Sequence, residues 1–584
     1  MAPLNGSPPT ERGGWWHEYV CPAHGVELAH IGFDSGNFPA GGVPCPHGCH
    51  VDTPAVRGAW TVLAHHFWAR RIRLLAYQGQ GADLLTSYAR LYSELTKAGE
   101  HEQAQGWMQR GRLFHQALTD AVWGVPIGHA VLTLTEHPDR GGLGETLPML
   151  DDMVAGARLA RDAMVAQDNF SSNYTAWFNA LGTTASQAAA AVRGEAWDGA
   201  AEWLTGEHGQ FAHLHAATGE DGWEWESSTY YHGFVLRAYL LSLRGFDPSQ
   251  APDRLESMIR ALSEIATDGG ILPALHDGPY RRRPLALEWL ELAALAQQFT
   301  SNHSLQAIAT QARIEAGPTY DGLEDTLTNW FIAPARADNH PHAASSVAAA
   351  SVAQPVRTSS ARPRIVTTAA FAVVRTAGIH AVLDHGPHGG SHGHHDKLAL
   401  YLYGVSTPWQ PDPGQVPYGH AQWRDHYKSV AAHPTIRIDG LEPAEATGQL
   451  IHDDNSVTAT IDGWYDGVRA TRKLIAADNY LLDVVRVSAD RKREIVLQFR
   501  PDVDLTVEVA PNAIRTTWTG DEKLYGYHRG NGIPLTRPGP GPADDPQRTR
   551  TWLDWTVVGT EATFCSVYST TPLDTALAEV ITDV

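Results

Sequence analysis

The residues best suited to catalysis or metal binding gather in Gly389–Gly440. This segment contains Ser391-His392-Gly393-His394-His395-Asp396, with three histidines and one aspartate within five positions. Because residues two apart on a strand face the same side, His392, His394 and Asp396 would share one face of an extended segment. Such a face could present two imidazoles to one metal ion or one substrate. With 30 histidines in the chain, a solvated, glycine-rich loop is the simpler alternative.

Two later segments supply further ligands of the same kind. Asp412 lies in Pro411-Asp412-Pro413-Gly414, and His433 lies in Ala431-Ala432-His433-Pro434-Thr435. A carboxylate and a third histidine from neighbouring strands would complete a nitrogen and oxygen set that suits zinc or a similar transition ion. The three segments together are harder to explain by chance than a single His-x-His motif.

The N-terminal half contains two polar turns that lead into predicted helices. In the first, Ser171 or Ser172 can cap a helix, which places Asn173 and Tyr174 in its first turn. Free backbone N–H groups and the helix dipole favour an anion there, although Asn173 could equally be a simple capping residue. In the second, a turn rich in Glu and Ser leads into a helix with Tyr231 near its start. Tyr231 could face a cleft or be a packing aromatic.

A third polar loop, Leu272–Arg283, ends in three consecutive arginines beside a turn. Such a run is usually a solvated face. In a chain with a net charge of −21, it is also the best candidate for a local anion-binding patch. The acidic balance otherwise argues against general binding to nucleic acid or to anionic membranes.

The elements that must position these residues divide into two kinds. Apolar spacing of three and four predicts helices from residue 55 to about residue 330, arranged as a toroid or solenoid. These helices are expected at residues 60–68, 84–95, 106–121, 147–166, 174–192, 229–243, 255–265, 285–299 and 305–316. After Ile365 the period changes to two in short segments, which predicts an antiparallel β-sandwich. A stretch rich in Ala, Ser and Pro between the two halves predicts a linker.

Composition limits the remaining possibilities. A chain of 584 residues is too long for one hydrophobic core. Its 19 tryptophans are suited to stacking on sugar rings as well as to core packing. The sequence shows no basic and apolar leader, and no span judged long enough for a membrane helix. We therefore expect a cytoplasmic protein, or a secreted one if a signal peptide has been removed.

The first fifty residues contain three of the four cysteines of the chain. Cys21 precedes His24, and Cys45 and Cys49 flank His47. Cysteines next to histidines suggest a small zinc knuckle, but their spacing departs from the usual paired CxxC pattern. Free buried thiols are the alternative, and four cysteines in so long a chain do not make a disulfide framework.

The motifs around His392, Asp412 and His433, with helices first and sheets second, resemble the heparinase II/III-like polysaccharide lyases, which include alginate lyases. The segments Asn173–Trp177 and Glu226–His232 support this resemblance. It implies a multidomain α+β fold, with an N-terminal (α/α) toroid followed by a C-terminal antiparallel β-sandwich. The expected divisions are an N-terminal extension at 1–54, the toroid at 55–335, a linker at 336–364 and the sandwich at 365–584.

The resemblance also implies a reaction and the residues that perform it. The reaction is β-elimination at a uronic acid in an anionic polysaccharide or oligosaccharide, which leaves a 4,5-unsaturated sugar. Asn173 is expected to hydrogen-bond the substrate carboxylate, Tyr231 to act as base, acid or both, and His392 to face the substrate. Glycosaminoglycans are the expected substrates, with alginate as the alternative.

A structural divalent metal is implied by the same resemblance. Its expected ligands are His394, Asp412 and His433, and the expected ion is Zn²⁺, with Mn²⁺ or Ca²⁺ as alternatives. Further substrate contacts are expected from Trp177, Glu226, His276, Arg281 and Arg282.

One departure from the family pattern concerns the base. The family often has a histidine directly after the asparagine, where this chain has Tyr174. Glucuronate and iduronate present the C5 proton from opposite faces. Tyr174 could therefore replace the second base, His392 could take that role, or the enzyme could be restricted to one epimer.

Two other classes of protein remain open from sequence. A glycoside hydrolase on a helical toroid would need two carboxylates in the cleft, for which Glu224, Glu226 and Asp277 are available. A non-catalytic carbohydrate-binding or metal-storage protein would need no acid or base. The product separates lyase from hydrolase, because only β-elimination creates an ultraviolet-absorbing double bond.

Overall fold

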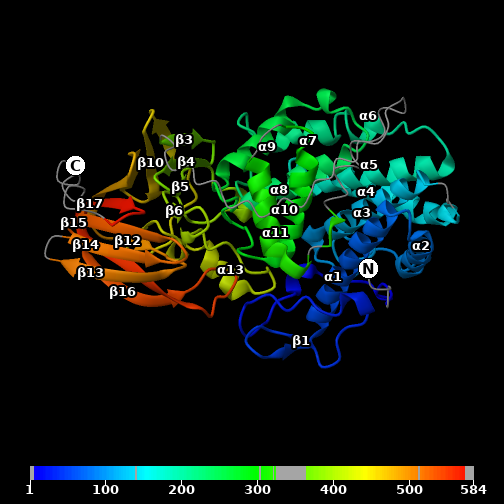
Figure 1. The fold of residues 1–584 in the computed structure, drawn as a ribbon, viewed down its shortest axis with the longest axis horizontal. Coiled ribbons are helices and arrows are strands. Elements are labelled where there is room, and N and C mark those ends of the chain that lie inside the picture. The colour runs from blue at the N-terminus through cyan, green and yellow to red at the C-terminus, as the bar shows by residue number, and fades with distance from the viewer. Residues whose placement is uncertain are drawn as a thin grey trace.

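The structure is a computed structural model that describes residues 6–137, 141–300, 304–319, 321–323, 363–510 and 513–572. Helices fill the first half of the chain and antiparallel sheets fill the second (Figure 1). The predicted order of a helical domain followed by a β-sandwich domain is therefore confirmed. Nearly all of the predicted linker lies outside the described residues.

The helices agree with the predicted ones in most places. They are α1 (Pro54–Tyr77), α2 (Ala82–Thr96), α3 (Ala117–Thr135), α4 (Leu147–Ala166), α5 (Asn173–Arg193), α6 (Ala200–Trp203), α7 (Gln210–Ala217), α8 (Thr229–Ser242), α9 (Asp253–Ile265), α10 (Arg283–Ala296), α11 (Ser304–Ala316) and α13 (Ala421–Lys428).

The helix predicted at residues 106–121 is wrong in most of its length. Residues 106–116 form a short 3-10 turn and a loop, and α3 begins only at Ala117. The Asp120 carboxylate accepts backbone N–H groups of Arg112, Leu113 and Phe114, which holds this loop in a non-helical course. A short acceptor side chain thus competes with helical hydrogen bonding.

Helix α3 also corrects the expectation that no segment is long enough to cross a membrane. It has 19 residues and the hydropathy of a membrane span, yet 72% of that stretch is buried inside the protein. It packs between α1 and α5. The apolar length of α3 is that of a core helix of the toroid.

Two sheets form the described part of the C-terminal half. The smaller has the order β3-β4-β5-β6-β7, and the larger has the order β13-β14-β15-β17-β12-β11-β10-β9, with β16 paired to β17 and β8 to β12. The strands are β3 (Arg364–Thr367), β4 (Phe371–Thr376), β5 (Ile379–Asp384), β6 (Leu400–Tyr403), β7 (Pro408–Gln410), β8 (Ile436–Ile438), β9 (Gln449–His452), β10 (Ser456–Tyr465), β11 (Val468–Ala476), β12 (Leu481–Phe499), β13 (Asp504–Ala510), β14 (Ala513–Thr519), β15 (Lys523–Gly530), β16 (Ile533–Pro540) and β17 (Thr549–Ser569). A two-residue hairpin, β1 (Val43–Pro44) with β2 (His50–Val51), lies in the N-terminal segment.

The smaller sheet is the layer that joins the two halves (Figure 1). Successive residues of a strand face opposite sides, and here both sides are buried. Phe371 and Val373 of β4 belong to the helical core, whereas Ala372 and Val374 belong to the core shared with the larger sheet. The loops at the edge of this sheet therefore lie directly against the toroid.

Candidate active site

The predicted catalytic residues of the helical half lie in the first turns of two neighbouring helices. Asn173 is the first residue of α5, whose N-cap Ser172 accepts the backbone N–H of Tyr174. Tyr231 is the third residue of α8, and its backbone N–H is capped by the Ser228 hydroxyl. Helices α5 and α8 pack against each other. Two positive helix ends consequently point into the same region, which favours a bound anion.

The histidine-rich segment reaches these helix ends through a close contact between two loops. Residues 390–392 form a 3-10 turn and the strand starts only at Leu400, so the expected extended face is absent from this segment. Gly389 has φ +86°, and a Cβ there would lie 2.1 Å from the Glu226 carbonyl oxygen. Only glycine permits both this backbone conformation and this approach. The contact brings His392 Nε2 to 3.6 Å from Glu226 Oε1.

His392 and Tyr231 form a stacked pair at the centre of the site. Their ring centroids are 3.7 Å apart with an interplanar angle of 24°. The Tyr231 hydroxyl lies 2.7 Å from the Tyr418 hydroxyl, which in turn lies 3.0 Å from His392 Nδ1. Burial, followed by the nearby Tyr418 and Asp277, raises the pKa of Tyr231 well above its ordinary value. Tyr231 therefore holds its proton at neutral pH.

Asp277 binds the groups around this pair together. Its Oδ2 lies 2.9 Å from His392 Nδ1 and 3.0 Å from the Tyr418 hydroxyl, and both Asp277 oxygens accept from Arg424 Nη1 at 3.0 Å. Its Oδ1 lies 3.1 Å from His394 Nε2. Burial alone would raise the pKa of Asp277, but the hydrogen bonds from the two histidines and the Arg424 charge hold it well below its ordinary value. Asp277 is thus an ionised acceptor.

Asn173 and Glu226 form a second buried pair beside His392. The Asn173 amide nitrogen lies 3.3 and 3.2 Å from the two Glu226 oxygens. Burial raises the pKa of Glu226, against the opposing effects of His392 and Asn173. Asn173 is 3% exposed, and its Oδ1 has no hydrogen-bond partner among the residues that the structure describes. The pair therefore offers an amide N–H and, in its neutral form, a carboxylic acid proton to an incoming anion.

The three predicted metal ligands meet in space. Ligand atoms of His394, Asp412 and His433 lie within 4.8 Å of one another, and all three residues are buried. His394 Nδ1 is a buried nitrogen that has no hydrogen-bond partner in the described part of the chain. Burial lowers the pKa of His394 to about 4 and that of His433 to about 3, so both imidazoles are neutral, as metal ligands must be.

The outer hydrogen bonds of these histidines have the arrangement common at metal sites. His394 Nε2 faces the Asp277 carboxylate, and His433 Nε2 lies 2.8 Å from the Tyr427 carbonyl oxygen. Metal-bound histidines usually donate their second N–H to such oxygens. The residues present therefore fit a zinc-type ion.

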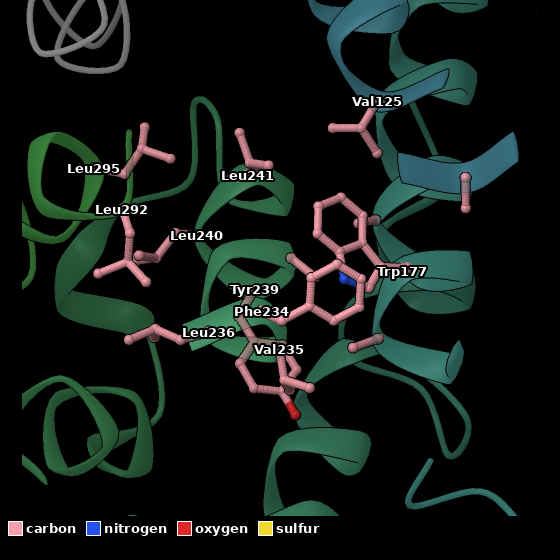
Figure 2. Close-up of a cluster of buried hydrophobic side chains, with 14 of the residues drawn as sticks. Val125, Trp177, Phe234, Val235, Leu236, Tyr239, Leu240, Leu241, Leu292 and Leu295 are labelled. Carbon is pink, nitrogen blue, oxygen red and sulfur yellow. The ribbon is translucent and has the colours of Figure 1, made fainter. Parts of the chain in front are cut away.

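Two residues expected to contact substrate lie instead in the protein interior. Trp177 is fully buried and packs on Phe234 of α8, with ring centroids 4.9 Å apart (Figure 2). Its position on α5 turns it toward the toroid core. His276 is also fully buried, with Nε2 3.0 Å from Asp384 and 3.4 Å from Asp396. Both side chains can support the site but cannot touch a substrate in this structure.

The other expected side chains are engaged elsewhere. Arg282 donates to both Glu27 oxygens at 2.9 and 2.7 Å, and Arg281 lies 3.2 Å from Asp502. The Tyr174 hydroxyl hydrogen-bonds to Gln116, and burial raises the Tyr174 pKa above its ordinary value. The cation that contacts Asp277 is Arg424, which lies outside the predicted arginine patch.

Sequence reasoning missed Tyr418 and Arg424, and considered Asp277 only for a hydrolase. Arg424 lies on α13, with its guanidinium 3.9 Å from the centre of the Tyr418 ring. Tyr418 follows the Asp412 motif by six positions. Neither residue belongs to a recognisable pattern, because both reach Asp277 across more than a hundred residues of sequence.

The comparisons with known proteins agree with this fold. Residues 366–550 match the family model described as heparinase II/III-like, C-terminal. This part of the chain is therefore similar to the C-terminal domain of heparinase II/III-like proteins. Comparison with curated protein sequences gives no match.

Solved structures extend the likeness to the helical half of the chain. A structure titled heparinase III has a TM-score of 0.56 at 14% identity, covering 88% of this chain and 76% of its own. The heparan sulfate lyase of Pedobacter heparinus has a TM-score of 0.54 at 14% identity, covering 89% and 77%. At this identity the likeness shows a shared fold.

Proposed function

We propose that this heparinase II/III-like chain is a polysaccharide lyase that cleaves uronic-acid polymers by β-elimination. The observation that carries the proposal is the stacked Tyr231 and His392 pair beside the buried Asn173 and Glu226 pair. The first pair can move protons and the second can hold a carboxylate. Both are needed for elimination at a uronate, and the match of residues 366–550 to the heparinase II/III-like C-terminal family model supports the same reaction.

The Asn173 and Glu226 pair would neutralise the substrate carboxylate. The Asn173 amide and a protonated Glu226 both donate hydrogen bonds, and the N-termini of α5 and α8 add positive potential. Removal of the C5 proton places negative charge on this carboxylate group. Donors fixed in advance at that position stabilise the transition state more than the ground state.

His392 is suited to remove the C5 proton. Asp277 is ionised and accepts the hydrogen on Nδ1, which leaves the Nε2 lone pair on the side of Glu226. The nearby carboxylate also stabilises the imidazolium that forms. Such a carboxylate–imidazole arrangement fixes both tautomer and orientation of a general base.

Tyr231 is suited to protonate the departing O4. Asp277 can only accept hydrogen bonds, so the Tyr418 proton points to it and the Tyr418 oxygen is free to accept from Tyr231. Tyr231 thus enters the reaction as a neutral phenol, and its proton turns from Tyr418 to O4 as the bond to O4 breaks. The other expected role of Tyr231, that of the base, is less favourable, because its raised pKa disfavours the phenolate.

The stacking of acid and base on one side of the site favours one substrate epimer. With ring centroids only 3.7 Å apart, His392 and Tyr231 reach the same face of a sugar ring. In glucuronate the C5 hydrogen and O4 lie on one face, whereas in iduronate they lie on opposite faces. Glucuronate is therefore the preferred residue, and Tyr174, held by Gln116, is not a second base.

A divalent metal bound by His394, Asp412 and His433 would have a structural role. Zinc is the ion that this ligand set suits best. When bound, it would supply a fixed positive charge and a rigid link between these segments. His394 also contacts Asp277, so this site would hold in place the carboxylate that orients His392.

The proposal is tested by ultraviolet absorbance with hyaluronan, unsulfated and sulfated heparan, chondroitin sulfate, dermatan sulfate and alginate, each offered separately. We expect absorbance to rise with at least one glucuronate polymer, and Tyr231→Phe and His392→Ala to abolish the rise. Tyr230→Phe is the matched control, because it removes the same hydroxyl group from the residue that precedes Tyr231 on α8. The Tyr230 ring packs on Phe234. New reducing ends without an absorbance rise would identify a hydrolase, and no reaction with any polymer would refute the proposed substrate class.

A further inference from the structure

A second cluster of metal-ligand residues lies in the N-terminal segment, away from the catalytic pair. It consists of Cys21, His24, Cys45 and Cys49, which we call the N-terminal cluster. One ligand atom from each lies within 4.8 Å of all the others. The mechanism proposed above uses none of these four residues.

The distances within the cluster agree with those of a tetrahedral zinc site. His24 Nδ1 lies 3.4 Å from Cys21 Sγ, 3.4 Å from Cys45 Sγ and 3.6 Å from Cys49 Sγ, and Cys21 Sγ lies 3.4 Å from Cys49 Sγ. Zinc bonds of about 2.3 Å to sulfur and about 2.0 Å to nitrogen place tetrahedral ligands about 3.5 to 3.8 Å apart. A disulfide would require about 2.0 Å between sulfurs, and all three cysteines are free thiols.

Two tight turns present the four ligands. In the first, the Gly25 N–H donates to the Cys21 carbonyl at 2.8 Å, which turns His24 back toward Cys21. In the second, Cys45 and Cys49 are paired at the tip of the β1–β2 hairpin, where the Cys45 N–H donates to the Cys49 carbonyl at 2.7 Å. The His47 N–H also lies 3.4 Å from Cys45 Sγ. A backbone N–H directed at a cysteine sulfur stabilises its metal-binding thiolate form.

We propose that the N-terminal cluster is a structural zinc site with three thiolate ligands and one imidazole. Four protein ligands fill a tetrahedron and leave no open position, which separates a structural zinc from a catalytic one. The site is independent of the His394, Asp412 and His433 set. Its three sulfur ligands are softer than the nitrogen and oxygen ligands of that set. Thiolates therefore select zinc over the hard ions that carboxylates accept.

The contacts of the surrounding segment show what the metal would hold in place. Gln547 donates to the His24 carbonyl at 3.1 Å, and His47 lies 2.9 Å from Asp545, so the cluster is attached to the C-terminal half. Upstream, the His17 ring stacks on Tyr418 with centroids 4.1 Å apart and an angle of 5°. Zinc would therefore fix a segment that contacts both the β-sandwich domain and Tyr418, the hydrogen-bond partner of Tyr231.

Metal analysis of the full-length protein tests the proposal. We expect the wild type to carry zinc bound through thiolates, and Cys49→Ser to lose one equivalent per chain. Cys565→Ser is the matched control, because Cys565 is a buried free cysteine in the β-domain, and it should keep that equivalent. His433→Ala, which alters the other candidate site, should also keep the zinc of the N-terminal cluster.

Cobalt substitution adds a spectroscopic test that can be made on the wild-type protein itself, with the variants as comparisons. Co²⁺ in this cluster should show intense sulfur-to-metal charge-transfer and visible bands, which His433→Ala retains and Cys49→Ser loses. A cobalt spectrum without thiolate bands would overturn the proposal. So would thiol titration showing a Cys21–Cys49 disulfide, or metal that disappears entirely in His433→Ala.

Discussion

The hydroxyl of Tyr418 is the most informative single group to remove. It connects the Tyr231 hydroxyl, His392 and Asp277. Tyr418→Phe deletes this oxygen and retains the ring, which still stacks on His17 and lies under the Arg424 guanidinium. The substitution thus changes the proton network with little change in packing.

The size of the effect follows from the hydrogen bonds that are lost. Among the described residues, the buried Tyr231 hydroxyl hydrogen-bonds to Tyr418 at 2.7 Å. Leaving a buried hydroxyl without its partner costs about 1–3 kcal/mol, which corresponds to about a 5- to 150-fold change in rate if the transition state bears it. We expect kcat to fall within that range. KM should change little, because Asn173 and Glu226 are untouched.

The assay is the initial rate of ultraviolet absorbance on the responding polymer, measured beside Tyr230→Phe and the wild type. Denaturant unfolding of each variant separates a catalytic loss from a loss of folded protein. A Tyr418→Phe enzyme with kcat within twofold of wild type would refute the proton chain from Tyr231 to Asp277. A large rise in KM at unchanged kcat would instead place Tyr418 in substrate binding.

Three further predictions concern other parts of the site. Burial raises the pKa of Glu226, so wild-type activity should fall as rising pH ionises this carboxylic acid. Glu226→Gln should lack this loss of activity at alkaline pH. Identical pH profiles of the two enzymes would contradict the role of Glu226 as a neutral hydrogen-bond donor. Burial alone would lower the pKa of His276, but Asp396 and Asp384 raise it to about 10 from 6.5. Its stabilisation should therefore be complete below pH 6.5 and lost toward pH 10, and His276→Gln should flatten this slope in denaturant unfolding. Trp177→Ala should lower the free energy of unfolding by about 3–5 kcal/mol and leave KM unchanged. A raised KM at unchanged stability would instead show that Trp177 contacts the substrate.

The parts of the fold that depend on local patterns could be predicted from sequence. Helix α5 begins where its predicted Ser cap places it, because capping is a property of a few adjacent residues. Helix α8 begins at the predicted residue, Thr229. The spacing of apolar residues changes from a period near 3.6 to a period of two, and this change correctly predicted where helices give way to strands. The prediction failed at residues 106–116, where the Asp120 carboxylate holds the loop by hydrogen bonds that no periodicity encodes.

The candidate site was predictable only where it follows a family motif. His392, Tyr231 and Asn173 carry such motifs, and their side chains meet as the proposed chemistry requires. The identity of the cation was not predictable. The run of three consecutive arginines predicted an anion-binding patch, but Glu27 and Asp502 neutralise two of them. Arg424 reaches Asp277 from α13, which lies 147 residues further along the chain.

Asp277 explains why the candidate site lies at the junction of the helical half and the C-terminal half. It belongs to the helical half, but its side-chain partners His392, His394, Tyr418 and Arg424 all belong to the C-terminal half. A buried carboxylate without such partners is strongly unfavourable, whereas a paired one is tolerated. The ionised state of Asp277 therefore requires the two halves to be docked. Since the same charge sets the tautomer of His392, association of the halves and competence of the base depend on one carboxylate.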